Sequence, residues 1–154
     1  MPVQKLKSFL DANSVRYVTM VHSRAFTAQE IAASAHIPGK ELAKTVMVKV
    51  DGKLAMAVVP ASLRVSIPLL RSVTGAKNVD LASETEFKKL FPDCEPGAMP
   101  PFGNLWGFDV YVASRLAEDD EIFFNAGTHT ELVKLKYAEF ERLVKPKVLE
   151  FAVR

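Results

Sequence analysis

KTVMVKVDGKLAMAVVP, residues 44–60, has the pattern of a β-hairpin. Val46, Val48 and Val50 alternate with other residues and so lie on one face of a strand. Asp51-Gly52 is a typical two-residue hairpin turn, and residues 53–60 form the returning strand. The pattern therefore predicts two antiparallel strands joined by this turn.

Helices and shorter strands are predicted on both sides of the hairpin. Apolar residues at helical spacing predict a helix from Val3 to about Asn13. Capping boxes at Thr27 and Ser83 each predict the start of a helix, the second carrying Phe87, Leu90 and Phe91 inward. Further helices are predicted over 66–74 and 137–144, and strands over 15–21, 79–81, 108–113, 121–126, 131–135 and 148–153. The mixture predicts an α+β fold, with a mostly antiparallel sheet and helices packed around it.

Length and composition limit the class of protein. The 154 residues are 49% hydrophobic and 25% charged, as in one globular domain over residues 1–154. No apolar run approaches the ~20 residues needed to cross a bilayer, and a secretory leader is not expected. The lone cysteine predicts a cytoplasmic protein. The net charge of +2 disfavours general DNA binding but is compatible with an RNA partner.

PGAMPPFG, residues 96–103, predicts a stiff loop because three prolines fix the backbone. Its remaining amides are those of Gly97, Ala98, Met99, Phe102 and Gly103. Such amides can face a ligand and cradle a carbonyl oxygen or a phosphate. The alternative interpretation is a tight surface corner before a strand.

Lys44 and His129 are candidates for chemistry elsewhere in the chain. Lys44 is two residues before Val46 and so lies on the same face of the predicted strand. Its ammonium therefore either lies in a wet cleft on the core side or is solvated at a frayed strand end. His129 lies in a glycine-containing loop after a predicted strand and could donate a hydrogen bond, move a proton or shape a pocket; alternatively it caps the next element. Cys94 is expected to be inert, and we expect neither a metal nor another cofactor.

Three separated segments together resemble the YbaK family, also called the aminoacyl-tRNA synthetase-associated domain. They are Ala43–Thr45, Pro96–Gly103 and Asn125–His129. The family is similar to the editing insertion of bacterial prolyl-tRNA synthetases, and the resemblance covers nearly the whole chain. It implies a compact α+β domain around a curved mixed sheet. It also implies a free-standing deacylase that hydrolyses the ester of a mischarged tRNA, with a cognate synthetase as a candidate partner.

The resemblance also implies roles for particular residues. Lys44 would be needed for activity, and the loop from Gly97 to Pro101 would contact the aminoacyl group. His129 would line the pocket for the amino-acid side chain. The other expected substrate contacts are Phe26, Thr27, Ala98, Met99, Pro100, Pro101, Phe102, Gly103 and Gly127.

One departure from the family concerns the substrate. The branch that clears alanine from proline tRNA often reads P-G-x-V-T-P-F, whereas Met99-Pro100 replaces the Val-Thr pair here. This change leaves the identity of the amino acid open. A non-catalytic module that binds aminoacyl-tRNA or a nucleotide in the same cleft is the alternative function.

Overall fold

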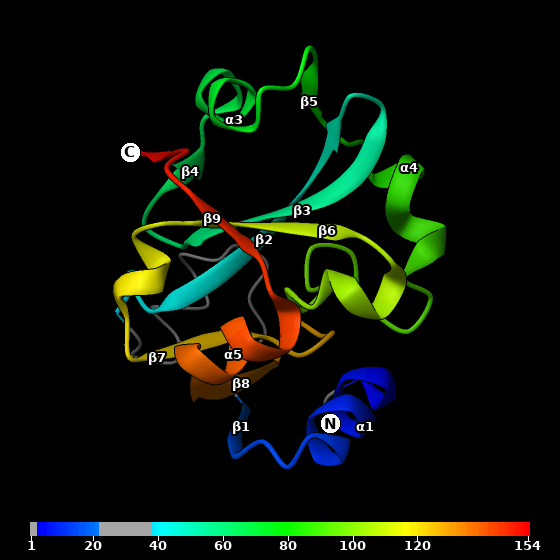
Figure 1. The fold of residues 1–154 in the computed structure, drawn as a ribbon. Coiled ribbons are helices and arrows are strands. Elements are labelled where there is room, and N and C mark those ends of the chain that lie inside the picture. Colours follow the sequence, from blue (N-terminus) through cyan, green and yellow to red (C-terminus); the bar gives the residue numbers. More distant parts are fainter. Residues whose placement is uncertain (1–2, 22–37) are drawn as a thin grey trace.

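The computed structural model describes residues 3–21 and 38–154. The predicted helix at 27–35 and the candidate residues His22, Phe26 and Thr27 lie outside the described residues. Within the described part, eight strands form one sheet in the order β1-β8-β7-β2-β3-β6-β9, with β5 added to β2 (Figure 1). The strands are β1 Tyr17–Val21, β2 Leu42–Val50, β3 Lys53–Pro60, β5 Val79–Leu81, β6 Asp109–Ala113, β7 Glu121–Asn125, β8 Glu131–Lys136 and β9 Lys147–Leu149. A two-stranded sheet pairs β4 (Arg64–Val65) with β10 (Ala152–Val153).

Antiparallel pairs predominate in a mixed sheet. The β2–β3, β2–β5, β1–β8 and β7–β8 pairs are antiparallel. The β2–β7, β3–β6 and β6–β9 pairs are parallel. The predicted hairpin is confirmed, and both turn residues, Asp51 and Gly52, have positive φ as a tight hairpin turn requires. The α+β prediction is confirmed, and Figure 1 shows the sheet curving so that β7 and β8 lie below β3 and β6.

Four α-helices accompany the sheet in the described part of the chain: α1 Gln4–Ala12, α3 Ile67–Thr74, α4 Glu84–Phe87 and α5 Tyr137–Val144. Short 3₁₀ turns occur at Lys88–Leu90, Gly103–Trp106 and Leu116–Glu118. The ends of α3 follow from its sequence. The Ser66 hydroxyl accepts from the Leu69 N–H over 3.3 Å, and Gly75 ends the helix in the left-handed conformation.

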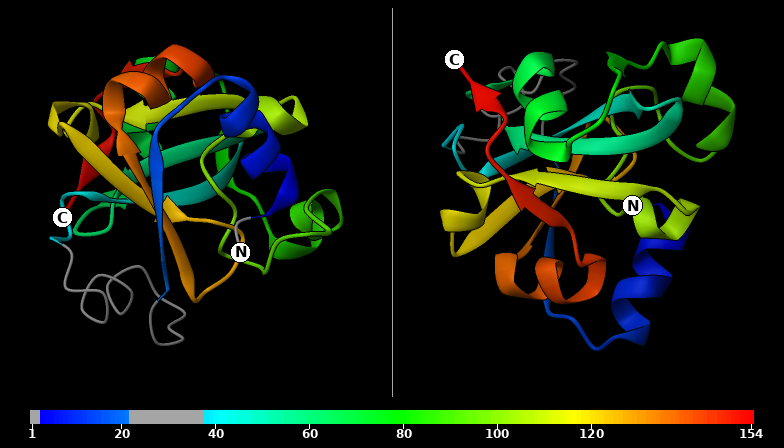
Figure 2. Two further views of the ribbon diagram at one scale, coloured as in Figure 1. Left: turned by 90° about the horizontal axis from the view of Figure 1, so that it is seen from below. Right: turned by 45° about the horizontal axis from the view of Figure 1, so that its top comes forward.

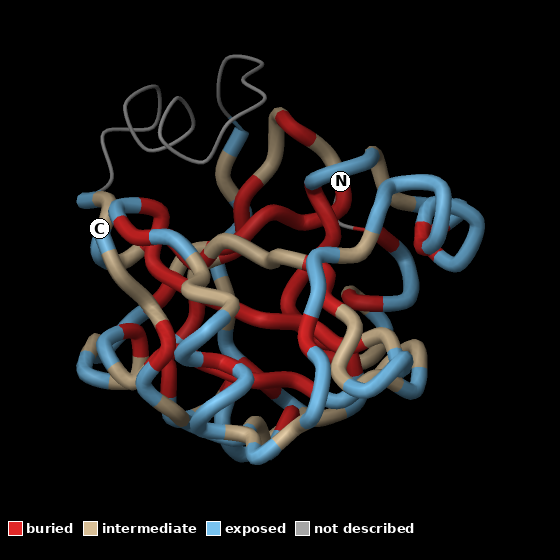
Figure 3. The backbone as a smooth tube through the Cα atoms, turned by 90° about the horizontal axis from the view of Figure 1, so that it is seen from above, coloured by how far each residue is buried: buried red, intermediate tan, exposed pale blue. Residues whose placement is uncertain are grey.

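Two apolar cores lie on opposite faces of the sheet. The larger core gathers α1, α5, the proline-rich loop and the inner face of β7, and the smaller core packs α3 against β2, β3 and β6. Figure 2 shows α3 and α5 on opposite sides of the sheet. In Figure 3 the buried backbone runs through the central strands, with exposed segments around it.

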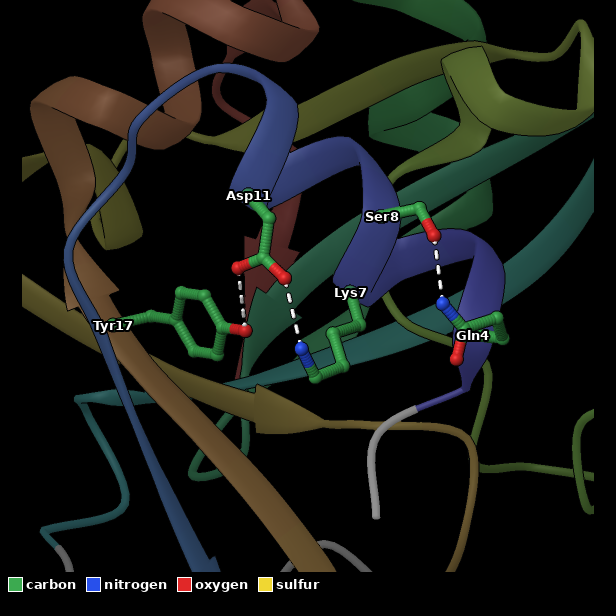
Figure 4. A network of polar contacts seen from close by, with 5 residues as sticks. All are labelled: Gln4, Lys7, Ser8, Asp11 and Tyr17. Atoms are coloured by element: carbon green, nitrogen blue, oxygen red, sulfur yellow. Dashed lines mark hydrogen bonds and ion pairs between the residues drawn. The ribbon is translucent and has the colours of Figure 1, made fainter.

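Polar contacts tie α1 to the start of β1 (Figure 4). The Lys7 ammonium donates to Asp11 Oδ2 over 2.8 Å, and the Tyr17 hydroxyl donates to Asp11 Oδ1 over 3.0 Å. These bonds lower the pKa of the Asp11 carboxyl, that from Lys7 contributing most. Gln4 donates to Ser8 one turn along the helix over 2.8 Å. The network fixes the angle at which the chain leaves α1 for the sheet.

Two sequence predictions of local structure are wrong. The helix that opens at Ser83 changes to a 3₁₀ turn after Phe87, which leaves Leu90 43% exposed instead of inward. The single closing strand predicted over 148–153 is divided between β9 and β10, which belong to different sheets. Phe151 lies between them, fully buried, and its carbonyl accepts from the Ser66 N–H over 2.8 Å. Burial of this ring turns the chain from one sheet to the other.

Candidate functional site

A tight turn at residues 95–98 holds the exposed part of the proline-rich loop. The Ala98 N–H donates to the Glu95 carbonyl over 3.0 Å and closes the turn. Gly97 has a φ of +83°, a left-handed conformation that favours glycine. Pro96 and Gly97 are exposed, whereas residues 98–103 are buried. The loop therefore presents the Pro96–Gly97 peptide group at the surface.

This turn is hydrogen-bonded to the segment that follows β7. The Glu95 N–H donates to the Gly127 carbonyl over 2.7 Å, and the Gly127 N–H donates to the Ala98 carbonyl over 3.0 Å. Gly127 itself has a φ of +104°, and an added Cβ would lie 3.1 Å from Cβ of Val3. Two segments far apart in sequence thus form one backbone unit.

His129 completes that unit. Its ring is 4% exposed, and Nε2 lies 2.7 Å from the Pro96 carbonyl oxygen. Its backbone N–H donates to Glu95 Oε1 over 3.1 Å. Because a carbonyl oxygen can only accept, Nε2 carries the proton in the first of these bonds. Nε2 therefore has no lone pair for general-base catalysis in this arrangement, and the ring holds the turn instead.

The bond from His129 also orients the amide of Gly97. The Pro96 C=O and the Gly97 N–H belong to one peptide group, and in a trans peptide they point in opposite directions. Holding the oxygen toward the ring therefore aims the N–H away from it. Among the described residues the Gly97 N–H has no hydrogen-bond acceptor. It is a fixed, exposed donor.

The inner half of the loop belongs to the large core. Phe102 is fully buried and packs edge-on or tilted against the rings of Phe9, Phe124 and Phe140. An added Cβ at Gly103 would lie only 2.8 Å from a valine methyl group of β6. Ala98, Met99, Pro100 and Pro101 are also buried. Phe102 and Gly103 therefore contribute to core packing, and their expected contact with substrate stays a prediction.

Cys94 lies under this unit. Its Sγ is 3.7 Å from where a Cβ at Gly127 would be. Burial, reinforced by the Asp93 carboxylate, raises the pKa of the thiol to about 11. Since the thiolate is the nucleophile, this cysteine is a poor one near neutral pH.

Lys44 lies near the start of β2, opposite Val59 of β3. It is half-buried, and its ammonium donates to the Leu63 carbonyl over 3.0 Å. Burial lowers the pKa of the amine. No carboxylate pairs with it in the part of the chain that the structure describes. A half-buried cation without a negative partner favours an anionic ligand.

β2 and β7 separate beside this lysine. The two strands pair only through Leu42 and Ala43 of β2. β5 joins the same edge of β2 from Val48 onward. The Met47 carbonyl still accepts from the Ala82 N–H over 3.0 Å, so among the described residues it is positions 44–46 that have no strand partner on that edge. The gap opens at the carboxyl end of β7, next to Lys44.

Asn125, the last residue of β7, has no role assigned from the sequence. Asn125 follows Phe124 and Lys44 follows Ala43, so both residues lie immediately past the last pair between β7 and β2, at the start of the gap. The asparagine is 8% exposed, and its Oδ1 has no hydrogen-bond partner among the described residues. A polar residue at the end of an apolar strand ordinarily indicates a turn, so there was no reason from the sequence to expect a buried functional side chain at Asn125.

The structure therefore brings some of the expected site residues together. Gly97, Ala98, Gly127 and His129 form one hydrogen-bonded unit. Lys44 lies on the neighbouring strand at the same end of β7, but its ammonium bonds to Leu63 and not to this unit.

Residues 3–21 and 38–154 contain neither a cluster of metal-binding side chains nor a helix that could span a membrane. Within these ranges no three His, Cys, Asp or Glu side chains are grouped as a metal site would need. None of the helices there has the length and apolar character to cross a bilayer.

Comparison with known proteins gives a family match. The pattern of the aminoacyl-tRNA editing domain matches residues 22–143. The chain is 32% identical over 114 residues to the Escherichia coli (strain K12) protein named multifunctional Ser/Thr-tRNA deacylase ProXp-y, covering 71% of this chain and 68% of that protein. It is 35% identical over 89 residues to the proline–tRNA ligase of Bacillus mycoides (strain KBAB4). That match covers 58% of this chain but 16% of the ligase.

Solved structures share the fold at lower sequence identity. The hypothetical protein APE2540 superposes with a TM-score of 0.86 at 20% identity, over 97% of this chain and all of the other. A candidate trans-editing enzyme for prolyl tRNA synthetase superposes with a TM-score of 0.82 at 17% identity, over 99% of this chain and 97% of that one.

Proposed function

The chain belongs to the aminoacyl-tRNA editing domain family, and on this premise we propose that it is a free-standing enzyme that hydrolyses the ester of mischarged aminoacyl-tRNA. The family includes aminoacyl-tRNA deacylases. One observation carries the proposal most directly: the Gly97 N–H is an exposed donor, fixed by His129, at the end of β7 where β2 separates from it.

A separate hydrolytic site is useful for a physical reason. An apolar synthetase pocket distinguishes amino acids that differ by one methylene by only ~1–3 kcal/mol. That difference is too small for accurate translation, so the wrong ester must be removed after it forms.

The reaction needs an attacking water and a donor for the oxyanion. Water adds to the ester carbonyl, and the carbonyl oxygen becomes negatively charged. The Gly97 N–H is suited to stabilise that charge because its direction is fixed before the substrate arrives. One such donor typically lowers the barrier by about 2.7–4 kcal/mol. The carbon–oxygen bond of the ester then breaks, releasing the amino acid and the ribose hydroxyl, which takes up the proton.

Lys44 is suited to hold the nucleic-acid end of the substrate. An ammonium has three donors, and one of them is used by the Leu63 carbonyl. The remaining donors and the unbalanced charge can bind the terminal phosphate or the adenosine of the tRNA. This contact would fix the ester against the Gly97 turn, and positioning of this kind contributes strongly to rate.

A deacylation panel tests the proposal. The protein is incubated with tRNAs charged with alanine, cysteine, serine or threonine, and loss of the labelled amino acid is compared with spontaneous hydrolysis. We expect at least one ester to be hydrolysed well above the spontaneous rate. No acceleration on any ester, together with measurable binding of the charged tRNA, would instead identify the non-catalytic binding module.

Partners and location follow from the same proposal. The mischarged aminoacyl-tRNA is the substrate, and a cognate synthetase is a second candidate partner. Both are present in the cytoplasm, where we place the protein. Repeating the panel with each synthetase added shows whether delivery by a synthetase increases the rate.

A further inference from the structure

We propose that Asn125 Oδ1 accepts a hydrogen bond from a hydroxyl group of the bound substrate. This inference rests on the proposed function and deepens it. It concerns a residue on the strand next to Lys44, outside the Gly97–His129 unit.

The side-chain oxygen of Asn125 is a buried acceptor that is unpaired within the described part of the chain. Asn125 is more than nine-tenths buried, and Oδ1 has no partner among the described residues. Buried polar atoms are almost always hydrogen-bonded, because a buried acceptor that has lost its water is costly. A ligand that supplies a donor would remove this cost.

The side chains on either side of Asn125 do not donate a hydrogen bond to Oδ1. Directly opposite in β8 is Leu132, a fully buried apolar residue. On the other side the β2–β7 pairing ends at Ala43, and the ammonium of the next residue, Lys44, donates to the Leu63 carbonyl. The oxygen therefore lies between an apolar side chain and a cation, next to the gap between β2 and β7.

Of the hydrogen-bond donors in an aminoacyl ester, a hydroxyl group is the one best suited to Asn125 Oδ1. Such a substrate carries an α-ammonium, the free hydroxyl of the terminal ribose and, for serine or threonine, a side-chain hydroxyl. Because Lys44 is adjacent, a second cation would be repelled at this position. A neutral hydroxyl is compatible with both the acceptor and the nearby charge.

Such a bond would discriminate strongly between substrates. A site that hydrogen-bonds a hydroxyl rejects the analogue that lacks it, because the buried partner is then left unpaired. Serine and alanine differ by this hydroxyl. The E. coli relative is named for serine and threonine. In this chain Met99 and Pro100 differ from the pattern of the branch that clears alanine. Both observations make serine and alanine the informative pair of substrates.

The experiment combines enzyme variants with substrate variants. Wild type, Asn125→Leu and Asn125→Asp are assayed for kcat/KM on seryl- and alanyl-tRNA. Each ester is also prepared on tRNA ending in 2′-deoxyadenosine, which lacks the free ribose hydroxyl. Binding of serylated and alanylated amide analogues of the terminal nucleoside is measured in parallel by calorimetry, because these analogues cannot be hydrolysed.

Two results support the proposal and distinguish the source of the hydroxyl. If it comes from the amino acid, wild type prefers seryl-tRNA at least tenfold, and Asn125→Leu loses that preference while alanyl-tRNA changes less than threefold. If it comes from the ribose, Asn125→Leu slows both esters alike, and the 2′-deoxy substrate is slower for wild type but not for the variant. Asn125→Asp keeps an acceptor oxygen and is expected to retain the wild-type pattern.

Other results contradict it. Equal slowing of all four substrates by Asn125→Leu, or no slowing of any, would overturn the assignment. A wild type that hydrolyses nothing would defeat the proposed function alone. The calorimetric comparison would then decide the role of Asn125, with loss of selective binding in Asn125→Leu as support and unchanged selectivity as contradiction.

Thermal unfolding separates a binding role from a structural one. Asn125→Leu removes an unpaired buried acceptor, so the variant is expected to melt at or above the wild-type temperature. If Asn125 merely stabilised the fold, the Asn125→Leu substitution would lower the melting temperature.

Discussion

At the scale of single residues, the contact between His129 and Pro96 links the fold to the chemistry. The imidazole Nε2 donates to a carbonyl oxygen, and the same peptide group carries the Gly97 N–H. Because a trans peptide is rigid, fixing one end fixes the other. We propose that His129 is a positioning residue that acts through this amide.

His129→Ala is therefore expected to lower kcat about tenfold, with less than a threefold change in KM. The donor amide remains but is no longer held in one direction, which costs part of the about 2.7–4 kcal/mol typical of an oxyanion donor. His129→Gln places an amide N–H near the position of Nε2 and is expected to recover most of the rate. Steady-state kinetics on the best ester of the panel measures both. Full activity of His129→Ala, or no recovery in His129→Gln, would contradict this role.

Sequence could predict the residue types of this site but not its hydrogen bonds. Gly97 and His129 were candidates from the loop composition and the family resemblance, and they are adjacent in the structure. Phe102 was a candidate for the same reasons, yet its ring fills the core. Asn125 begins one of the segments that carry the resemblance, but its burial and its unpaired oxygen could not be predicted because they depend on how the strands pack.

At the scale of helices and strands, turn and cap residues were sufficient to predict the hairpin and the helix ends. The sequence carried no comparable signal for which distant strands pair. The hairpin at Asp51-Gly52 and the ends of α3 follow from turn and cap residues. The parallel β2–β7 and β3–β6 pairs could not be predicted because no short connection encodes them. The separation of β2 from β7, which opens the candidate site, depends on this unpredicted pairing.

The corner between Leu116–Glu118 and β7 contains a partly buried carboxylate, that of Asp119. Asp119 Oδ2 is buried without a partner among the described residues. Burial, together with Glu41 and other nearby carboxylates, raises the pKa of Asp119 to about 6, although Lys40 opposes the shift. A group whose pKa is higher in the folded state stabilises that state while protonated. This contribution is present below about pH 4 and is lost as the pH rises through about 6.

Asp119→Asn should therefore stabilise the protein at pH 7.5 by about 1 kcal/mol, a value reduced to allow for its partial exposure to solvent. At about pH 3 the difference from wild type should nearly vanish, because Asp119 is then mostly protonated in both the folded and the unfolded chain. Urea unfolding at the two pH values measures it. Asp109→Asn, at an exposed carboxylate that begins β6, is the control and is expected to show no such dependence. An equal effect of Asp119→Asn at both pH values would contradict the account.

At the scale of the whole molecule, the candidate site is built on the main core. Phe102 continues the loop that carries Gly97 and packs against rings from α1, β7 and α5. The turn is thus anchored by the same packing that holds the domain together.

Phe102→Ala is expected to lower the free energy of unfolding by about 3–5 kcal/mol, the usual cost of deleting a fully buried ring. Leu90→Ala is the matched control. The sequence pattern placed Leu90 inward, but it is 43% exposed. Its removal should cost less than about 1 kcal/mol. Chemical denaturation of both variants measures the difference, and similar losses would show that the core is placed incorrectly.

The central claim is that this protein hydrolyses aminoacyl-tRNA and needs the cation at Lys44 to do so. The most direct measurement compares initial deacylation rates of wild type, Lys44→Met and Lys49→Met on the best ester of the panel. Lys49 lies on the same strand with opposite parity and pairs with Glu86 over 2.7 Å. We predict at least a hundredfold loss for Lys44→Met, as expected when substrate is no longer positioned, and little change for Lys49→Met. Wild-type rates in a folded Lys44→Met variant would contradict the claim.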